Sequence, residues 1–499
     1  MAPLIFQIIG YALCFVVLSA ITAFIAYTLY IHHQHEKYRH IPGPKRANFY
    51  LGNIPQFAET KSFSKQIHAW RLEFGPIFTM CALHSVVVVC CDTAAIKELM
   101  TRSKYPKDEK QYRPFHSLFG ARSLGKGLVS ETDHEVWARK RALFNPAFHR
   151  KYLMGLMEPF NTAADQLTNH LMQYADGKTE VTMLHEFGRI TLDIIGRVGF
   201  GIKEDVITNP NHQLCHLVPH LAMGMQAMYS NPLLELSPLP SHLRYKREMR
   251  ETAHRMRALG RECIEARMRA IEAGEEVPSD ILTYILDASN NLQEASFGME
   301  DMIDEFCTFF AAGQETTANL LSFCLLHLGH NPDVLSRLKK EIDSVVGGKD
   351  FIDFSDVGKL QYLTLVLKES LRLNGPIGGS NRRVLEDTEL CGYTVPKGST
   401  VVLPMFTMGR HEDHFKNPLT FDPERFTRDD DKPLFAYFPF SIGPRSCIGQ
   451  AFAMIEMKVI IAKLLSRYDF CLVPGQDLDF QEELTMKPKD GCKTFISLR

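Results

Sequence analysis

A long uncharged segment at the N-terminus constrains this chain most. No charged residue lies between Ala2 and Ile31, and Leu4–Ile31 is largely apolar. Roughly twenty apolar residues are enough to cross a bilayer as a helix. A cleaved signal peptide would have a charged start, a shorter apolar core and a small-residue cleavage site. The alternative is a buried core helix, but the length of the run favours a transmembrane signal anchor over residues 1–31.

The segment after this anchor is basic. Residues 32–50 contain Lys37, Arg39, Lys45 and Arg46, together with the stiff turn Pro42–Pro44. Positive charge on one flank of a membrane helix holds that flank in the cytosol. We therefore expect a basic linker over residues 32–50 and a cytosolic body over residues 51–499. In a eukaryotic cell this arrangement predicts the endoplasmic reticulum membrane.

Composition describes an ordinary globular body. Of the 499 residues, 45% are hydrophobic and 23% are charged, which excludes a disordered or collagen-like chain. The 56 Lys and Arg against 58 Asp and Glu give a net charge of -2, so we expect no nucleic-acid partner. The 12 cysteines are scattered without zinc-type spacing, which argues against a zinc ribbon or a disulfide scaffold.

Hydrophobic patterning predicts a helical body with a small β part. Two short β-rich runs, Ile77–Met80 and Ser85–Cys90, are separated by a turn. Beyond Asp92 the chain is mostly amphipathic and helical, except for a strand-like patch from Arg382 to Leu403. We find no internal repeat. The pattern predicts one large α-rich domain.

The strongest chemical signal is a single cysteine in the loop Phe440–Gly449, which leads into a helical segment, roughly Ile448–Leu465. A helix N-terminus and the neighbouring Arg445 both stabilise the Cys447 thiolate. The glycines would let a flat cofactor approach the backbone. One thiolate suits an axial position of haem iron, whereas zinc or an iron–sulfur cluster needs several ligands. The alternative is a buried structural cysteine in a turn.

A second signal is a possible ion-pair network. Glu369 and Arg372 share one face of the predicted helix Leu360–Leu373. Arg425, in the stretch Pro423–Phe426, could join them. The pattern taken alone is also typical of a solvated helix face.

A third signal lies in the predicted helix Met299–Leu328. Its interior contains Gly313, which costs about 1 kcal/mol relative to alanine, followed by Glu315 and Thr316 in an apolar stretch. One interpretation is a widened turn carrying a proton relay that faces a cavity. The other is a kinked core helix whose threonines bond back to their own carbonyls.

Together these motifs resemble the cytochrome P450 superfamily of haem-thiolate monooxygenases. The Cys447 loop matches its F-x-x-G-x-R-x-C-x-G signature, and Trp137 and Arg141 match its W-x-x-x-R. The motifs stand in the family's order, and the resemblance covers the whole chain from the anchor to Arg499. It implies a mainly α cytochrome P450 fold, a single haem domain preceded by one transmembrane helix.

The resemblance also implies roles for individual residues. Cys447 would be the axial ligand of the iron in haem b (iron protoporphyrin IX). The residues implied to bind the haem propionates are Trp137, Arg141, Arg382 and Arg445, with Arg383 an alternative to Arg382. Glu315 and Thr316 would deliver protons during dioxygen activation, and the residues of the structural network would be Glu369, Arg372 and Arg425. The substrate pocket would include Ile377, Gly378 and Asn381 in the loop after the Glu369 helix. It would also include Tyr112, Phe115, Leu124 and Val129 on the loop before the Trp137 helix, and Ala311 and Ala312 on the long helix, unless these six pack in the core.

Within the superfamily, the chain most resembles the cholesterol 24-hydroxylases. Shared runs include Tyr38–Pro44, Gly274–Pro278 and Leu472–Gln476. They imply hydroxylation of a sterol side chain. Gly378 and Asn381 stand where that family has aromatic residues, so another sterol, a fatty acid or a xenobiotic is an alternative substrate.

The resemblance implies an external electron donor, an NADPH–cytochrome P450 reductase, because the chain has no G-x-G-x-x-G motif and no complete phosphate loop. The predicted docking residues are Arg139, Lys140, Arg150 and Lys151; the alternative is a solvated basic face. A membrane-anchored haem sensor or carrier is a rival of a different class. It would not need Glu315 and Thr316, so their presence favours an enzyme.

Overall fold

The structure is a computed structural model that describes residues 2–499 except 103–104, 203–204, 232, 279, 292–296 and 428–434. It is mostly helical with several small β-sheets, which confirms the predicted fold class. The chain forms two compact units. The smaller contains Met1–Tyr105 and Gly379–Thr407, and the larger contains Pro106–Gly378 and Met408–Arg499. The division into residues 1–31, 32–50 and 51–499 stays a prediction.

The smaller unit is built around a four-stranded sheet with the strand order β1-β2-β9-β6. Strand β2 (Ser85–Cys90) pairs antiparallel with β1 (Ile77–Ala82) and parallel with β9 (Thr400–Leu403), and β6 (Ser380–Arg383) pairs antiparallel with β9. The first predicted run extends two residues further, to Ala82. The unit also contains α2 (Ile54–Thr60), α3 (Phe63–Phe74), α4 (Thr93–Thr101) and the hairpin of β7 (Thr388–Leu390) and β8 (Tyr393–Val395).

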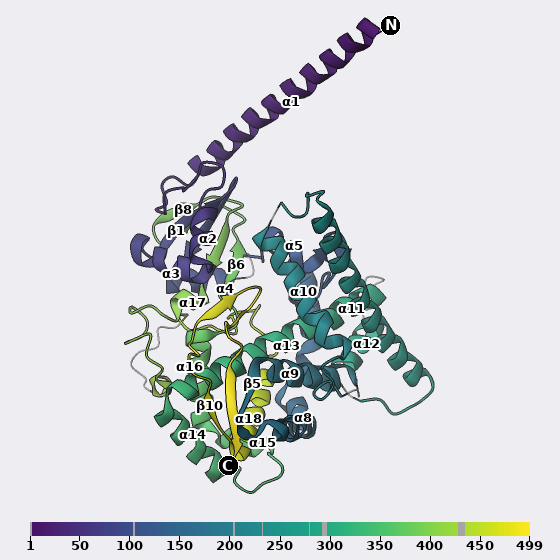
Figure 1. The fold of residues 1–499 in the computed structure, drawn as a ribbon, viewed down its shortest axis with the longest axis vertical. Helices are drawn as coiled ribbons and strands as arrows, with labels where there is room; N and C mark the ends of the chain where they lie inside the picture. The colour runs from purple at the N-terminus through teal and green to yellow at the C-terminus, as the bar shows by residue number, and fades with distance from the viewer. Residues whose placement is uncertain are drawn as a thin grey trace. The chain divides into compact units, whose positions relative to one another are not determined.

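The N-terminal helix α1 (Ala2–Glu36) projects from the smaller unit (Figure 1). An 18-residue window of its segment Leu4–Glu36 has a mean hydropathy of 2.5, and the segment is long and apolar enough to cross a membrane. The end of the helix is attached to the turn between β1 and β2. The Tyr27 hydroxyl lies 3.3 Å from His84 Nδ1, and His35 Nε2 lies 3.0 Å from the Leu83 carbonyl oxygen. These contacts fix the end of α1 against the sheet.

The larger unit contains most of the α-helices. They are α5 (Glu109–His116), α6 (His134–Phe144), α7 (Arg150–Gly155), α8 (Met157–Leu171), α9 (Met183–Phe200), α10 (Gln213–Ser230), α11 (Pro240–Glu272), α12 (Ile281–Asn291), α13 (Met299–His330), α14 (Pro332–Val345), α15 (Phe354–Lys359), α16 (Gln361–Asn374) and α18 (Gln450–Arg467). Its strands are β3 (Ser117–Leu118), β4 (Ala121–Arg122), β5 (Asp176–Thr182), β10 (Tyr468–Leu472), β11 (Phe480–Glu482), β12 (Met486–Pro488) and β13 (Lys493–Leu498).

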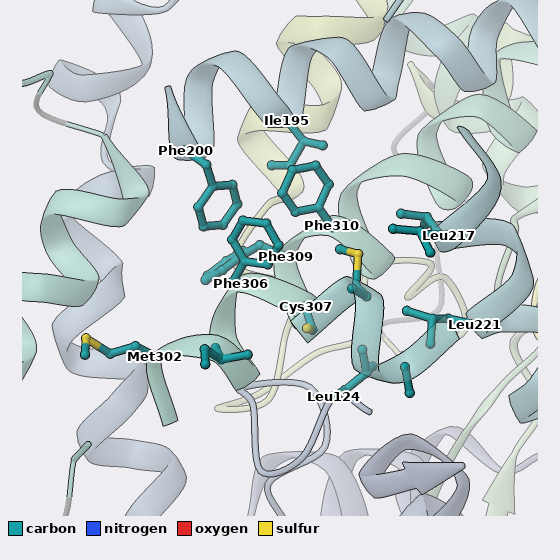
Figure 2. Close-up of a cluster of buried hydrophobic side chains, with 14 of the residues drawn as sticks. Leu124, Ile195, Phe200, Leu217, Leu221, Met302, Phe306, Cys307, Phe309 and Phe310 are labelled. Atoms are coloured by element: carbon teal, nitrogen blue, oxygen red, sulfur yellow. The ribbon is translucent and has the colours of Figure 1, made fainter. Parts of the chain in front are cut away.

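Helix α13 runs through the centre of the larger unit. Its first turn is capped because the Gly298 N–H donates to the Asp301 carboxylate at 3.0 Å, and Pro332 begins the next helix. Phe306, Phe309 and Phe310 project from it into a buried apolar cluster that Phe200 of α9 joins (Figure 2). This packing explains why an apolar sequence of this length forms a helix.

Candidate active site

The Cys447 loop is closed by its own backbone. The Cys447 N–H donates to the Phe440 carbonyl at 2.8 Å, and the Ser446 N–H donates to that of Gly443 at 3.1 Å. Gly443 has a φ of 73°, which a residue without Cβ adopts at little cost. The loop ends where α18 begins, so the thiol lies two residues before Gly449, which caps this helix.

Cys447 is exposed, although nearby protein atoms keep most water away from its thiol. This environment raises the pKa of the thiol by desolvation, while the Gly449 N–H and the Arg141 guanidinium lower it. Both of these groups favour the thiolate over the thiol. They therefore prepare Cys447 to act as a metal ligand once a metal ion replaces its proton.

Helix α6 and the loop bring four predicted residues together. The Arg445 guanidinium lies over the Trp137 ring, 4.1 Å from its centroid, and donates to the Glu131 carbonyl at 2.7 Å. Arg141 donates to the Ser446 carbonyl at 2.6 Å, beside Cys447. Asp133 starts α6 by accepting N–H bonds from its first turn. The Arg141 guanidinium is thus held near the thiol, and the Arg445 guanidinium is held against Trp137 of the same helix.

This donor set fits haem b. A single accessible thiol suits the one axial position that a haem-thiolate protein supplies, and adjacent guanidinium groups suit two carboxylates of the same cofactor. The predicted third cation, Arg382, belongs to the smaller unit. It is buried and donates to the Asn381 carbonyl at 2.7 Å, whereas its neighbour Arg383 is half-buried. The contact of Arg382 with a haem propionate stays a prediction.

Helix α13 has one accessible turn within an otherwise buried stretch. Ala312 is exposed and Glu315 and Thr316 are half-buried, while the flanking turns are buried. The Thr316 hydroxyl donates back to the Ala312 carbonyl at 2.8 Å, as in the second of the two interpretations. Local accessibility and a hydroxyl beside a carboxyl are the features that a proton relay requires.

The widened turn predicted at Gly313 is wrong, because α13 is α-helical throughout Met299–His330. The presence of glycine at position 313 has a different physical explanation. A Cβ atom at this position would lie 3.3 Å from Cγ1 of Ile195 on α9, so glycine allows the two helices to pack closely.

Glu315 has a partner that sequence reasoning missed. Burial raises the pKa of its carboxyl, and a hydrogen bond from Thr485 and the charge of Lys487 lower it, while Glu483 raises it. These three residues belong to the β11–β12 hairpin. The hairpin carries no recognisable motif, so no local signal connects it with Glu315.

The structure brings Glu369, Arg372 and Arg425 together. The Arg372 guanidinium donates to both Glu369 oxygens at 2.8 and 2.7 Å, and Arg425 Nε donates to Oε1 at 2.9 Å. Both arginines also donate to backbone carbonyls between Gly409 and Thr420. The network therefore ties α16 to the segment that precedes the Cys447 loop.

The predicted pocket residues lie in different environments. Tyr112 and Phe115 lie on helix α5 rather than on a loop, which corrects the prediction, and their rings stack at 5.4 Å. Leu124 is buried in the apolar cluster and Ala311 packs against it, as in the core-packing alternative (Figure 2). The Val129 carbonyl accepts a hydrogen bond from Lys107.

The loop after α16 carries the remaining pocket residues. The side chain of Ile377 is 37% exposed and Gly378 is half-buried. Asn381 belongs to β6 of the smaller unit. The loop contacts the β11–β12 hairpin, because the Met486 N–H donates to the Pro376 carbonyl at 2.8 Å.

The predicted docking surface is wrong for Lys140. Its ammonium is buried, lies 3.2 Å from a Glu305 oxygen and donates to the Lys126 carbonyl. A buried and paired cation is not available to a protein partner. Arg139, Arg150 and Lys151 are exposed, and their role stays a prediction.

Comparisons with known proteins agree with this geometry. The family model described as Cytochrome P450 matches residues 42–494. The chain is 29% identical over 469 residues to Cytochrome P450 3A2 of Rattus norvegicus, covering 91% of this chain and 90% of that protein. It is 28% identical over 452 residues to Cytochrome P450 4d2 of Drosophila melanogaster, covering 86% and 88%. It is 32% identical over 386 residues to Cytochrome P450 CYP72A616 of Paris polyphylla, covering 75% and 73%.

Proteins of this family bind haem b, and they typically receive electrons from a redox partner and act on lipophilic substrates. When bound, the haem iron supplies the activation of dioxygen. The thiol, the guanidinium groups and the family match lead to one conclusion. The chain belongs to the cytochrome P450 family and is a monooxygenase.

Proposed function

We propose that this monooxygenase is anchored in the endoplasmic reticulum membrane and hydroxylates the side chain of a sterol. The runs that it shares with the cholesterol 24-hydroxylases, such as Tyr38–Pro44 and Leu472–Gln476, support the substrate. The apolar helix α1 and the basic linker support the location.

The overall reaction consumes one dioxygen, two electrons and two protons for each hydroxyl group formed and each water released. Cys447 would hold the haem iron, and Trp137, Arg141, Arg382 and Arg445 would hold the propionates. Glu315 would supply protons, because burial raises the pKa of its carboxyl and so favours the protonated form. Thr316 would pass them on through its hydroxyl. Electrons would come from an NADPH–cytochrome P450 reductase.

A fatty acid or a xenobiotic is the second candidate substrate. Gly378 and Asn381 replace the aromatic residues of the 24-hydroxylases, and Ile377 beside them is partly exposed. Smaller side chains in this loop would leave room for a substrate of another shape.

Measuring which substrate the enzyme hydroxylates decides between these candidates. The protein is incubated with reductase, NADPH and cholesterol, and in parallel with lauric acid, and the products are compared with hydroxylated standards by mass spectrometry. We expect a 24-hydroxylated sterol. A hydroxylated fatty acid without a sterol product would move the function to the second candidate. A haem-loaded protein that reduces no dioxygen with reductase and NADPH would instead be a haem sensor or carrier.

Two variants test the site. Cys447→Ser should lose the thiolate-type carbon monoxide spectrum, and its survival would remove Cys447 as the ligand. Thr316→Ala should keep this spectrum but release more hydrogen peroxide per NADPH. Unchanged peroxide release in that variant would remove Thr316 from proton delivery.

A further inference from the structure

Two adjacent carboxylates of α13, Asp304 and Glu305, hold the segment 122–131, here called the 122–131 loop. Both side chains are fully buried. The Asp304 carboxylate accepts the Lys126 N–H at 2.7 Å, and the Glu305 carboxylate accepts the Leu128 N–H at 2.9 Å. The backbone of the loop is therefore bound directly to side chains of the helix.

Two arginines balance the charge of Asp304. Arg122, the first residue of the loop, donates to the two Asp304 oxygens at 3.0 and 2.6 Å, and Arg257 of α11 donates at 2.6 Å. Arg257 also donates to the Ser123 carbonyl of the loop at 3.1 Å. A buried carboxylate is stable only when such partners compensate for its desolvation. Asp304 therefore joins α11, α13 and the loop at one point.

Glu305 connects α13 with α6. The Lys140 ammonium of α6 lies 3.2 Å from a Glu305 oxygen and donates to the Lys126 carbonyl of the loop. On α6, Lys140 lies between Trp137 and Arg141 in the sequence. The buried pair therefore fixes the helix that carries two of the residues proposed to hold the haem propionates.

The end of the loop contacts a third residue of that set. Arg445 donates to the Glu131 carbonyl at 2.7 Å. The Glu131 N–H in turn donates to the Gly127 carbonyl inside the loop at 2.8 Å. A displacement of the loop from α13 therefore moves the acceptor that orients the Arg445 guanidinium.

The loop lies too close to α13 for a side chain at two of its positions. A Cβ atom on Gly125 would overlap the Asp304 carboxylate, and one on Gly127 would overlap the Thr308 hydroxyl. Gly125 also has a φ of 53°, which glycine adopts at little cost. The two glycines thus allow the close approach in which the backbone N–H groups reach the carboxylates.

We propose that Asp304 and Glu305 are positioning residues for the haem propionates. They act through the 122–131 loop on Arg445 and through Lys140 on α6. This inference rests on the proposed function, in which Arg445 and two residues of α6 hold the propionates. It adds two carboxylates that set where those groups stand.

Two measurements on the haem-loaded enzyme test the proposal. Hydrogen exchange at the Lys126 and Leu128 amides, followed by mass spectrometry, measures opening of the loop. Transfer of haem to apomyoglobin measures how firmly the cofactor is held. Both are made at pH 8, because burial raises the pKa of Glu305 to about 7 and its carboxylate is mostly charged above that pH.

We expect Asp304→Asn to speed both exchange and haem transfer several-fold. The carboxylate accepts four hydrogen bonds, shared between its two oxygens, whereas an amide has only one acceptor oxygen. The substitution also leaves Arg122 and Arg257 without their counter-charge. Both losses weaken the hold of α13 on the loop.

The matched control is Asp280→Asn. Asp280 is 3% exposed, accepts two hydrogen bonds from Arg267 of α11 and one from the Thr283 N–H, and lies outside the loop. This variant also removes a buried counter-charge from an arginine of α11. It should leave the exchange of the Lys126 and Leu128 amides and the haem transfer near the wild-type rates.

Further variants separate the two routes. Gly127→Ala displaces the loop without changing a charge and should speed both rates several-fold. Gly155→Ala on α7 is its control, because a Cβ atom there would meet nothing within 4 Å. Glu305→Gln keeps an acceptor for the Leu128 N–H but loses the charge that pairs with Lys140. It should speed haem transfer more than exchange.

The outcomes separate this inference from the proposed function. If Arg445→Ala leaves haem transfer at the wild-type rate, Arg445 holds no propionate, and both that assignment and the positioning role fall. If Arg445→Ala speeds transfer while Asp304→Asn and Gly127→Ala speed only exchange, the inference alone falls. It also falls if Asp280→Asn is as defective as Asp304→Asn, since the cause is then a general loss of stability. If neither loop variant folds, unchanged haem transfer in Glu305→Gln would overturn the inference.

Discussion

At the scale of single residues, the clearest energetic feature is the carboxylate of Glu369. It is fully buried and accepts hydrogen bonds from Arg372, Arg425 and the Asp422 N–H. A buried charge is tolerated only when its partners compensate for desolvation. Glu369 is therefore the member whose loss leaves two cations without their counter-charge.

We predict that Glu369→Gln destabilises the larger unit by about 3–5 kcal/mol, because one partner of a buried ion pair is removed. Urea unfolding of the haem-loaded protein measures this. The control is Glu180→Gln, since Glu180 pairs with Lys493 at the surface with both side chains about 40% exposed. That change should cost about 0–1 kcal/mol. An equal loss of unfolding free energy in the two variants would show that the buried Glu369 carboxylate contributes no more to stability than a surface ion pair.

Sequence spacing could predict part of this network. Positions 369 and 372 share a helix face, so their pairing follows from local geometry. Their burial does not, because the carbonyls of Gly409 and Pro418 that Arg372 also bonds come from a distant segment. The same limit applies to Thr485, which lies 170 positions from Glu315.

At the scale of elements, α11 and α13 approach each other through a glycine. A Cβ atom on Gly260 of α11 would lie 2.8 Å from the ring of Phe306 on α13. Phe306 is fully buried within the apolar cluster, so its ring has little room to move (Figure 2). The close contact of the two helices therefore depends on glycine at this position.

We predict that Gly260→Ala destabilises the protein by about 1–3 kcal/mol through overpacking, although alanine favours helix. The matched control is Gly358→Ala in the short helix α15, where a Cβ atom would meet nothing within 4 Å. That variant should be neutral or up to about 1 kcal/mol more stable. Denaturant midpoints measure both. A stabilising Gly260→Ala would mean that Phe306 can move aside.

Element boundaries were predictable to within about two residues where the signals are local. The predicted helix Leu360–Leu373 is α16 (Gln361–Asn374), and the helix predicted from Met299 ends at His330 rather than Leu328. Caps and hydrophobic periodicity carry this information. The prediction of a widened turn at Gly313 was wrong because the reason for this glycine is its close contact with Ile195, which lies on another helix.

At the scale of the whole molecule, the two compact units combine segments that are far apart in sequence. Residues Gly379–Thr407 join the N-terminal segment because β9 pairs with β2 in parallel, which hydrophobic patterning cannot reveal. The N-terminal apolar helix, in contrast, can be predicted from local sequence alone. The length and uncharged composition of residues 2–31 are sufficient to predict a membrane helix.

The anchor leads to a prediction about orientation. The cations Lys37, Arg39, Lys45 and Arg46 follow α1, so the body should lie in the cytosol and the N-terminus in the lumen. An Asn-x-Thr acceptor with a polar spacer, placed before Met1, should be glycosylated in microsomes, whereas the same tag after Arg499 should not. Gel mobility before and after glycosidase treatment measures both. The control moves four lysines to the N-terminal side and replaces the four cations with glutamine, which should invert the pattern. Glycosylation of the C-terminal tag in the unaltered chain would place the body in the lumen, away from a cytosolic reductase, and would contradict the proposed electron supply.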